Sequence, residues 1–161
     1  MKNIKWLSIS AFGIFLLIFG STVGTIVFSM IWYPNIIVCV PPETLEECLP
    51  QSVIPSFTLI FQATTYFILG GAGIIGIGLI FFMLNRNRTG NIFMLIGLGI
   101  GLVAVFFYFF GAIEGAVVYT EPSGKGLALL ILLTINFPFE LIGLILNFIS
   151  RKKLSEQKIY Q

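Results

Sequence analysis

The sequence contains no histidine and no aspartate, and its only two cysteines, Cys39 and Cys48, lie close together in one segment. Imidazole is the commonest protein ligand of redox metals and zinc, and the commonest general base. We therefore expect no cofactor, no metal site and no catalytic residue in this chain. The sequence also offers no evident combination of acid, base and nucleophile for an enzyme that acts on lipids.

Charge is scarce as well. Charged residues make up 10% of the 161 residues, whereas soluble domains carry roughly 25%. Hydrophobic residues reach 57%, so the chain cannot cover a water-facing surface. These values indicate an integral membrane protein that forms a single domain over residues 1–161. The net charge of +2 is too small to indicate a nucleic-acid partner.

Four apolar stretches, at about 4–33, 57–84, 92–119 and 127–149, are each longer than the roughly 20 residues that a transmembrane helix needs. Within lipid, backbone polar groups must find partners inside the protein, and these stretches do not alternate apolar with polar residues as barrel strands do. The sequence therefore predicts an all-α integral membrane protein with four transmembrane helices. The first stretch is far longer than the apolar core of a signal peptide, roughly 7–15 residues, so we expect it to be retained.

The basic residues are distributed unevenly among the connections. All but Lys125 precede the first stretch, join the second to the third, or follow the fourth. These residues are Lys2, Lys5, Arg86, Arg88, Arg151, Lys152, Lys153 and Lys158. Because cytoplasmic segments of membrane proteins are enriched in Lys and Arg, we expect both termini, including the tail 150–161, to be cytoplasmic. The loop 34–55 is then extracytoplasmic, and we expect the protein to lie in the cell membrane.

The loop 34–55 contains the stretch CVPPETLEEC and five of the seven prolines. An extracytoplasmic position favours a disulfide between Cys39 and Cys48, and closing so small a ring is worth about 2–3 kcal/mol by loop entropy. The loop then becomes a rigid acidic cap. Two interpretations stay open: the disulfide only staples a connection, or the cap docks against a neighbouring subunit.

Glycines recur four positions apart in two of the expected helices, once in the first and twice in the third. Such spacing allows the backbones of two membrane helices to approach closely. The residues concerned are Gly20 with Gly24, Gly97 with Gly101, and Gly111 with Gly115. We expect these positions to lie at helix–helix contacts.

Two acidic residues, Glu140 and Glu114, lie inside apolar stretches, where ionisable side chains are costly and often functional. Glu140 lies near the middle of the stretch 127–149, close to Asn136 and two residues after Pro138, which removes a backbone donor. Glu114 lies nearer the outer end of its stretch. Two roles stay open for Glu140 with Asn136: a hydrogen bond that holds neighbouring helices together, or the handling of a proton or cation.

Two families share isolated features with this chain. Glu140 resembles the mid-membrane glutamate on the last helix of the four-helix proteolipid of rotary proton-pumping ATPases, but the central connection of that family faces away from the cytoplasm, and here it carries Arg86 and Arg88. The pair Cys39 and Cys48 after Trp32 resembles part of the pattern of claudin-like tetraspan proteins, whose Gly-Leu-Trp motif is absent here. We assign the chain to neither family.

The sequence favours a non-catalytic accessory subunit with four transmembrane helices in a larger membrane complex, for example one of respiratory or oxidase type. Its expected partners are other membrane-protein subunits and lipid, with no nucleic acid and no soluble substrate. The alternative is a small membrane protein that conducts protons or cations through Glu140.

Overall fold

The computed structural model describes the backbone of residues 2–37, 54–118 and 125–156, and the side chains of residues 4–26, 62–111, 134 and 136–156. Over these residues the chain forms helices and no strand. The helices are α1 (Lys2–Ile37), α3 (Ile54–Met83), α4 (Asn87–Val118) and α5 (Lys125–Glu156). The expected all-helical architecture is therefore confirmed for the part of the chain that the structure describes.

Three of the helices are long and apolar enough to cross a membrane, over Ile4–Ile26, Gln62–Met83 and Asn87–Gly111. The described part of α5 is more polar, because it contains a glutamate and two asparagines in addition to its basic end. The three apolar spans indicate a membrane protein, as the composition predicts.

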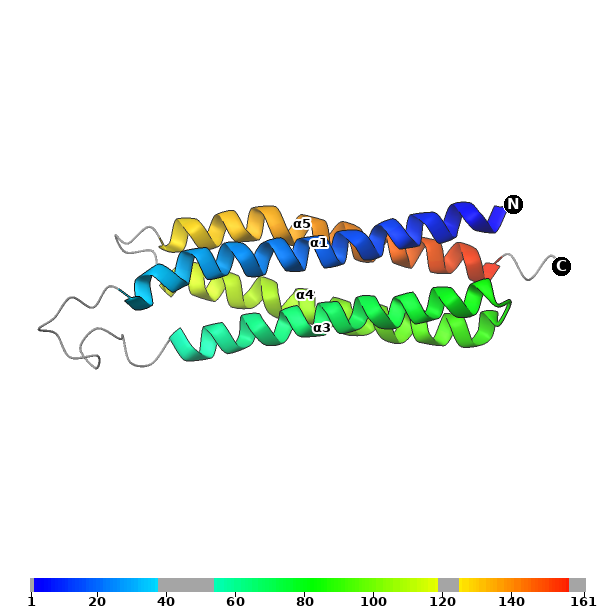
Figure 1. Cartoon of the computed structure of the whole chain (residues 1–161), viewed down its shortest axis with the longest axis horizontal. Helices are drawn as coiled ribbons and strands as arrows, with labels where there is room; N and C mark the ends of the chain where they lie inside the picture. The colour runs from blue at the N-terminus through cyan, green and yellow to red at the C-terminus, as the bar shows by residue number, and fades with distance from the viewer. Residues whose placement is uncertain (1, 38–53, 119–124, 157–161) are drawn as a thin grey trace, which may run out of the picture.

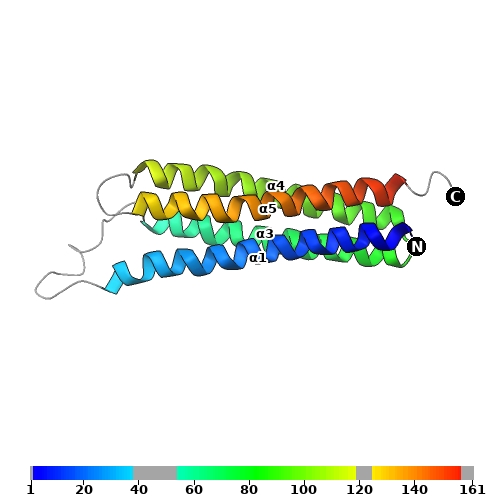
Figure 2. The same cartoon turned by 90° about the horizontal axis from the view of Figure 1, so that it is seen from above.

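The helices form an antiparallel bundle (Figures 1 and 2). α3 packs most extensively against α4, and α1 against α5, while contacts of α4 with α5 and of α1 with α3 join the two pairs. The start of α1, the turn between α3 and α4 and the end of α5 lie at the same end of the bundle (Figure 1). We call this the basic end, because it carries the described cations Lys5, Arg86, Arg88, Arg151, Lys152 and Lys153.

Several helix bounds differ from those expected. α1 continues through Pro34 to Ile37, and α3 begins at Ile54, so the first connection is shorter than 34–55. Proline costs one backbone hydrogen bond but fits helical φ angles, so a helix can pass through it. α4 begins at Asn87 instead of residue 92. α5 runs beyond residue 149 to Glu156, where Lys153 Nζ and Glu156 Oε2 form an ion pair of 3.0 Å.

The turn between α3 and α4 is fixed by a helix C-cap at Asn85. This residue has a φ of 58°, in the left-handed region that asparagine tolerates better than most residues. Arg86 N donates to Phe81 O at 2.9 Å, and Asn85 N donates to Phe82 O at 3.1 Å. This pair of bonds is a Schellman motif, which satisfies carbonyl groups at the end of α3 and turns the chain directly into α4.

Glycines allow α3 and α4 to touch backbone to backbone. A Cβ atom added to Gly97 would stand 2.7 Å from Gly71 O and 2.9 Å from Ile75 N. Nearer the turn, a Cβ atom on Gly90 would stand 2.8 Å from Gly78 O. Each distance is too short for any side chain, so the two helices pack closely only because glycine is present.

The inward face of α3 completes this contact with apolar side chains. They recur at alternating intervals of four and three residues, the spacing of two helices that wrap around each other. The buried residues of this face are Ile68, Ala72, Ile75, Leu79 and Phe82. Met94, Ala104 and Val105 of α4 belong to the same buried cluster.

We predict that Gly97→Ala destabilises the bundle, because the added methyl group meets backbone atoms that cannot move aside independently. Overpacking of this kind costs about 1–3 kcal/mol. Gly99→Ala is the matched control, because nothing lies within 4 Å of a Cβ atom there. Unfolding in detergent, followed by the loss of helical circular dichroism, measures both variants. Equal stability of the two variants would contradict the close contact of α3 with α4.

Candidate functional site

The contact between α1 and α5 differs from the glycine contact of α3 with α4 because it contains polar side chains. The α5 residues that are buried on this side recur at alternating intervals of four and three, and we call the contact the α1–α5 seam. From α5 it includes Asn136, Glu140, Gly143, Asn147 and Ser150, and from α1 it includes Ser10, Gly13, Leu17, Gly20, Ser21 and Gly24. The same spacing in both helices keeps their faces together over the length of the seam.

Near the basic end, the seam is held by a satisfied hydrogen-bond network. Ser10 Oγ donates to Asn147 Oδ1 at 2.5 Å, and Asn147 Nδ2 donates to Gly143 O at 2.8 Å. Ser10 and Asn147 are both fully buried. Room for the amide comes from Gly13, where a Cβ atom would stand 2.5 Å from Asn147 Nδ2.

Farther from the basic end, Glu140 and Asn136 face the two glycines of α1. A Cβ atom on Gly20 would stand 3.2 Å from Glu140 Cγ, and one on Gly24 would collide with the Asn136 amide. Glu140 and Asn136 each retain only 2% of their exposure. The structure therefore brings together four of the residues singled out in the sequence, with each polar side chain seated over a glycine.

Several buried oxygens of this layer lack a hydrogen-bond partner among the described residues. They are Glu140 Oε2, Asn136 Oδ1 and Ser21 Oγ. The Tyr108 hydroxyl of α4 lies beside Asn136 and near Glu140. The seam thus holds a carboxyl, an amide and a hydroxyl in one buried group, with a phenol at its edge.

Pro138 lies on the opposite side of α5 from this group. It is exposed, and α5 continues through it as a helix. Because Pro138 has no N–H to donate, one backbone hydrogen bond of α5 is missing beside Glu140. The proline therefore loosens the helix next to the buried layer without entering it.

The other residues singled out in the sequence lie elsewhere. Gly97 lies between α4 and α3, and a Cβ atom on Gly101 would stand 2.8 Å from Leu144 Cδ2 of α5. Gly111 is buried in α4. Glu114 and Gly115 belong to α4 but lie outside the described side chains, and Cys39 and Cys48 lie outside the described residues.

Sequence reasoning missed the other members of the seam. Ser21 follows Gly20 directly, and Asn147 lies seven residues after Glu140, so the repeat of seven in α5 could have identified the asparagine. Nothing in the sequence places Tyr108 beside α5, because this contact depends on how the two helix pairs meet. Ser10 likewise becomes identifiable only once its partner Asn147 is known.

The chemistry available to this layer is that of oxygen atoms. Among the described residues, no group of three or more His, Cys, Asp or Glu side chains could hold a metal ion. A carboxyl with a neighbouring amide oxygen and hydroxyl can hold a proton or accept hydrogen bonds from water.

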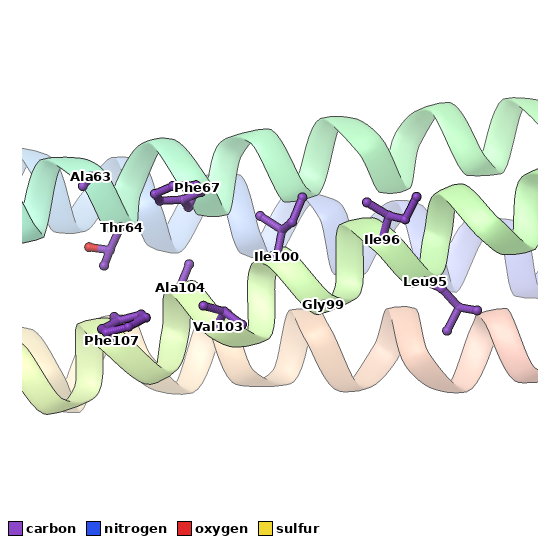
Figure 3. A pocket seen from close by; sticks show the side chains of 10 residues that line it. All are labelled: Ala63, Thr64, Phe67, Leu95, Ile96, Gly99, Ile100, Val103, Ala104 and Phe107. Carbon is purple, nitrogen blue, oxygen red and sulfur yellow. The ribbon is translucent and has the colours of Figure 1, made fainter.

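A second feature lies on the outside of the bundle, between α3 and α4. It is an apolar groove of about 570 Å³. Side chains of both helices line it, as Figure 3 shows, with Phe67 from α3 and Phe107 and Leu95 from α4 among them. Gly99 also lines the groove, and a Cβ atom there would meet open space. We call this the outer groove.

No protein-family model matches the chain, and neither a curated protein nor a solved structure is significantly similar to it.

We predict that Ser10→Ala destabilises the α1–α5 seam by about 0.6–1.7 kcal/mol, the range measured for hydrogen bonds between membrane helices. The substitution removes the donor to the buried Asn147 Oδ1. Ser8→Ala is the matched control, because Ser8 is exposed and its hydroxyl bonds only to Ile4 O of its own helix. Thermal or denaturant unfolding in detergent compares the two. A loss at Ser8 as large as that at Ser10 would show that the seam does not depend on this bond.

Proposed function

We propose that the chain is a non-catalytic accessory subunit of a larger membrane-protein complex, and that the outer groove receives a transmembrane helix of a neighbouring subunit. The observation that carries this proposal is a set of outward-facing glycines on the α3–α4 pair. Gly70, Gly73 and Gly99 have nothing within 4 Å of where a Cβ atom would stand. The fold of this chain makes no use of their small size.

The contrast with neighbouring glycines supports a contact with another helix. Gly71, Gly78, Gly90 and Gly97 all stand against backbone atoms of the partner helix within the chain. Gly70 lies one turn from Phe67, on the outer face of α3. Because Gly71 lies opposite Gly97 in the antiparallel pair, Gly70 lies at nearly the same height in the bundle as Gly99. Small residues at the same height on two adjacent helices allow the backbone of a third helix to approach both of them closely.

The walls of the outer groove are suited to the sides of such a helix. Phe67 and Phe107 are 60% and 59% exposed, and Val103 also projects from α4. The groove follows α4 from Leu95 to Phe107, which is about 18 Å at 1.5 Å per residue. A contact of this length covers more than half of the roughly 30 Å hydrocarbon core.

We further propose that the basic end faces the cytoplasm. Support comes from the gathering of the described cations at one end of the bundle, since Lys and Arg are enriched on the cytoplasmic side. The connection from α1 to α3 contains Cys39 and Cys48, and on this topology it lies outside the cell. The outside of the cell is oxidising, so a disulfide between the two cysteines can persist there.

We predict that Gly99→Leu leaves the chain folded but releases it from its complex, because a Cβ atom at this position meets open space and the leucine side chain occupies the outer groove. Native electrophoresis after extraction in mild detergent should show the wild-type chain in one large band with unlike subunits, and the variant in a small one. Gly70→Leu should act in the same way.

Ala11→Leu is the matched control for that experiment, since Ala11 is exposed on α1, away from the outer groove. It should remain in the large band. A wild-type chain that migrates alone, or as a complex of identical subunits, would overturn the proposed accessory role.

We predict that mass mapping without reduction finds Cys39 joined to Cys48. After reduction of intact cells, a membrane-impermeant thiol reagent should label both cysteines. A cysteine introduced at Asn85, in the exposed turn between α3 and α4, should be labelled only after the membrane is opened. Labelling of Asn85→Cys and the native pair from the same side would reject the proposed topology.

A further inference from the structure

We propose that Glu140, Asn136 and Ser21 form a proton-binding site within the α1–α5 seam, in which Glu140 carries an exchangeable proton. The site lies on α1 and α5, whereas the outer groove lies on α3 and α4. The proposed proton-binding site can therefore be tested independently of the accessory role. Its ligand is the proton itself, held by oxygen atoms of two helices.

The first argument is the pattern of unsatisfied atoms. Glu140 Oε2 and Asn136 Oδ1 are both acceptors when the carboxyl is ionised, and neither has a donor among the described residues. Glu140 and Asn136 are one helical turn apart on the same face of α5. A proton on Glu140 supplies a donor to a layer in which both oxygens otherwise lack one, and the buried Ser21 hydroxyl of α1, also without a partner among these residues, can donate or accept.

The second argument is the absence of any positive side chain that could pair with an ionised Glu140 in the described part of the bundle. Arg151 lies eleven residues farther along α5, about 16 Å away at 1.5 Å per residue. On α1 the nearest described cation is Lys5, fifteen residues before Gly20. A buried charge without a partner costs several kcal/mol or more, and a bound proton removes that cost.

The remaining titratable groups do not change this balance. α4 contributes Tyr108, which is a neutral phenol under ordinary conditions and lies beside Asn136. The described part of α3 contributes Tyr66, which is exposed on the outside of the bundle. Glu156 on α5 is at the basic end and pairs with Lys153. The carboxyl of Glu140 is therefore the group in this layer whose protonation can change.

The third argument is the contrast with the neighbouring polar layer of the same seam. There, Asn147 finds both a donor and an acceptor, through Ser10 and Gly143 O. The same two helices with the same spacing thus provide one buried amide with both a donor and an acceptor. The unsatisfied oxygens around Glu140 therefore follow from the residue types at that level. An ionised glutamate can only accept hydrogen bonds and must bind a proton in order to donate one, whereas an asparagine donates through its own amide.

The distance of the site from the basic end places it near the middle of the membrane. About 16 Å from Arg151 is roughly half of the 30 Å hydrocarbon core. A proton taken up here must come through the protein, and the missing backbone bond beside Pro138 loosens α5 at this level.

Reaction with N,N′-dicyclohexylcarbodiimide tests the proposal, because this reagent enters lipid and modifies protonated carboxyls. The full chain in lipid nanodiscs should be modified at Glu140 at mildly acidic pH, with the rate falling as the pH rises. Replacing choline chloride by sodium chloride at equal ionic strength should leave the rate unchanged. Glu156, which is exposed to water, should remain unmodified.

The isosteric variant Glu140→Gln should lose the modification and keep the helical content and melting temperature of the wild type. Infrared difference spectra of the wild-type chain between two pH values should contain a band of a protonated carboxyl, which keeps the test valid if the variant does not fold. Absence of modification at every pH, a rate independent of pH, or protection by sodium alone would each overturn the proposal, the last by identifying a cation site.

Discussion

Apolar helices surrounded by lipid have no hydrophobic reason to prefer one another, so close fit and polar contacts decide how this bundle assembles. Both kinds of contact occur in this bundle, one in each of the two helix pairs. α3 and α4 touch through glycine backbones, as at Gly71 and Gly97. α1 and α5 touch through glycines that face polar side chains, as at Gly20 and Glu140. The distribution of glycine therefore determines which helices pair and what chemistry each contact can hold.

A glycine opposite a polar side chain has two effects in a membrane. It leaves space for the side chain between the helices, and it lets the helices close around that side chain so that lipid does not reach it. Gly13 does this for Asn147, and Gly24 does it for Asn136. In the first case the amide also accepts one hydrogen bond and donates another, so the layer stabilises the pair. In the second case Asn136 is also buried, but its Oδ1 atom and Glu140 Oε2 have no hydrogen-bond donor among the described residues. The stability of that layer therefore depends on any group that supplies a donor, such as a bound proton.

Hydropathy predicted the helical class and four spans, because both follow from the solvent that each residue meets, and three spans are found among the described residues. The helix bounds were less predictable, because hydropathy marks only the apolar part of a helix, whereas α5 continues through the charged segment Arg151–Glu156. The pairing of Gly20 and Gly24 with Glu140 and Asn136 depends on the antiparallel register of two helices far apart in the sequence, which no local pattern contains. Tyr108 was missed for the same reason, since it reaches the seam from the other helix pair.

The separation of the two pairs has a consequence for any response to protonation. If Glu140 loses its proton, the negative charge has no counter-ion within the seam, and the cost can fall only if α1 and α5 move apart or admit water. The described glycine contacts of α3 with α4 contain no ionisable group, but Tyr108 of α4 lies beside Asn136 and near Glu140, so α4 borders the same buried layer. On the proposed proton-binding site, a change at Glu140 acts first on the contact of α1 with α5 and reaches α4 through Tyr108. The outer groove lies between α3 and α4, whose described glycine contacts hold no ionisable group, so the proposed partner site is separated from the proposed proton site by α4 itself.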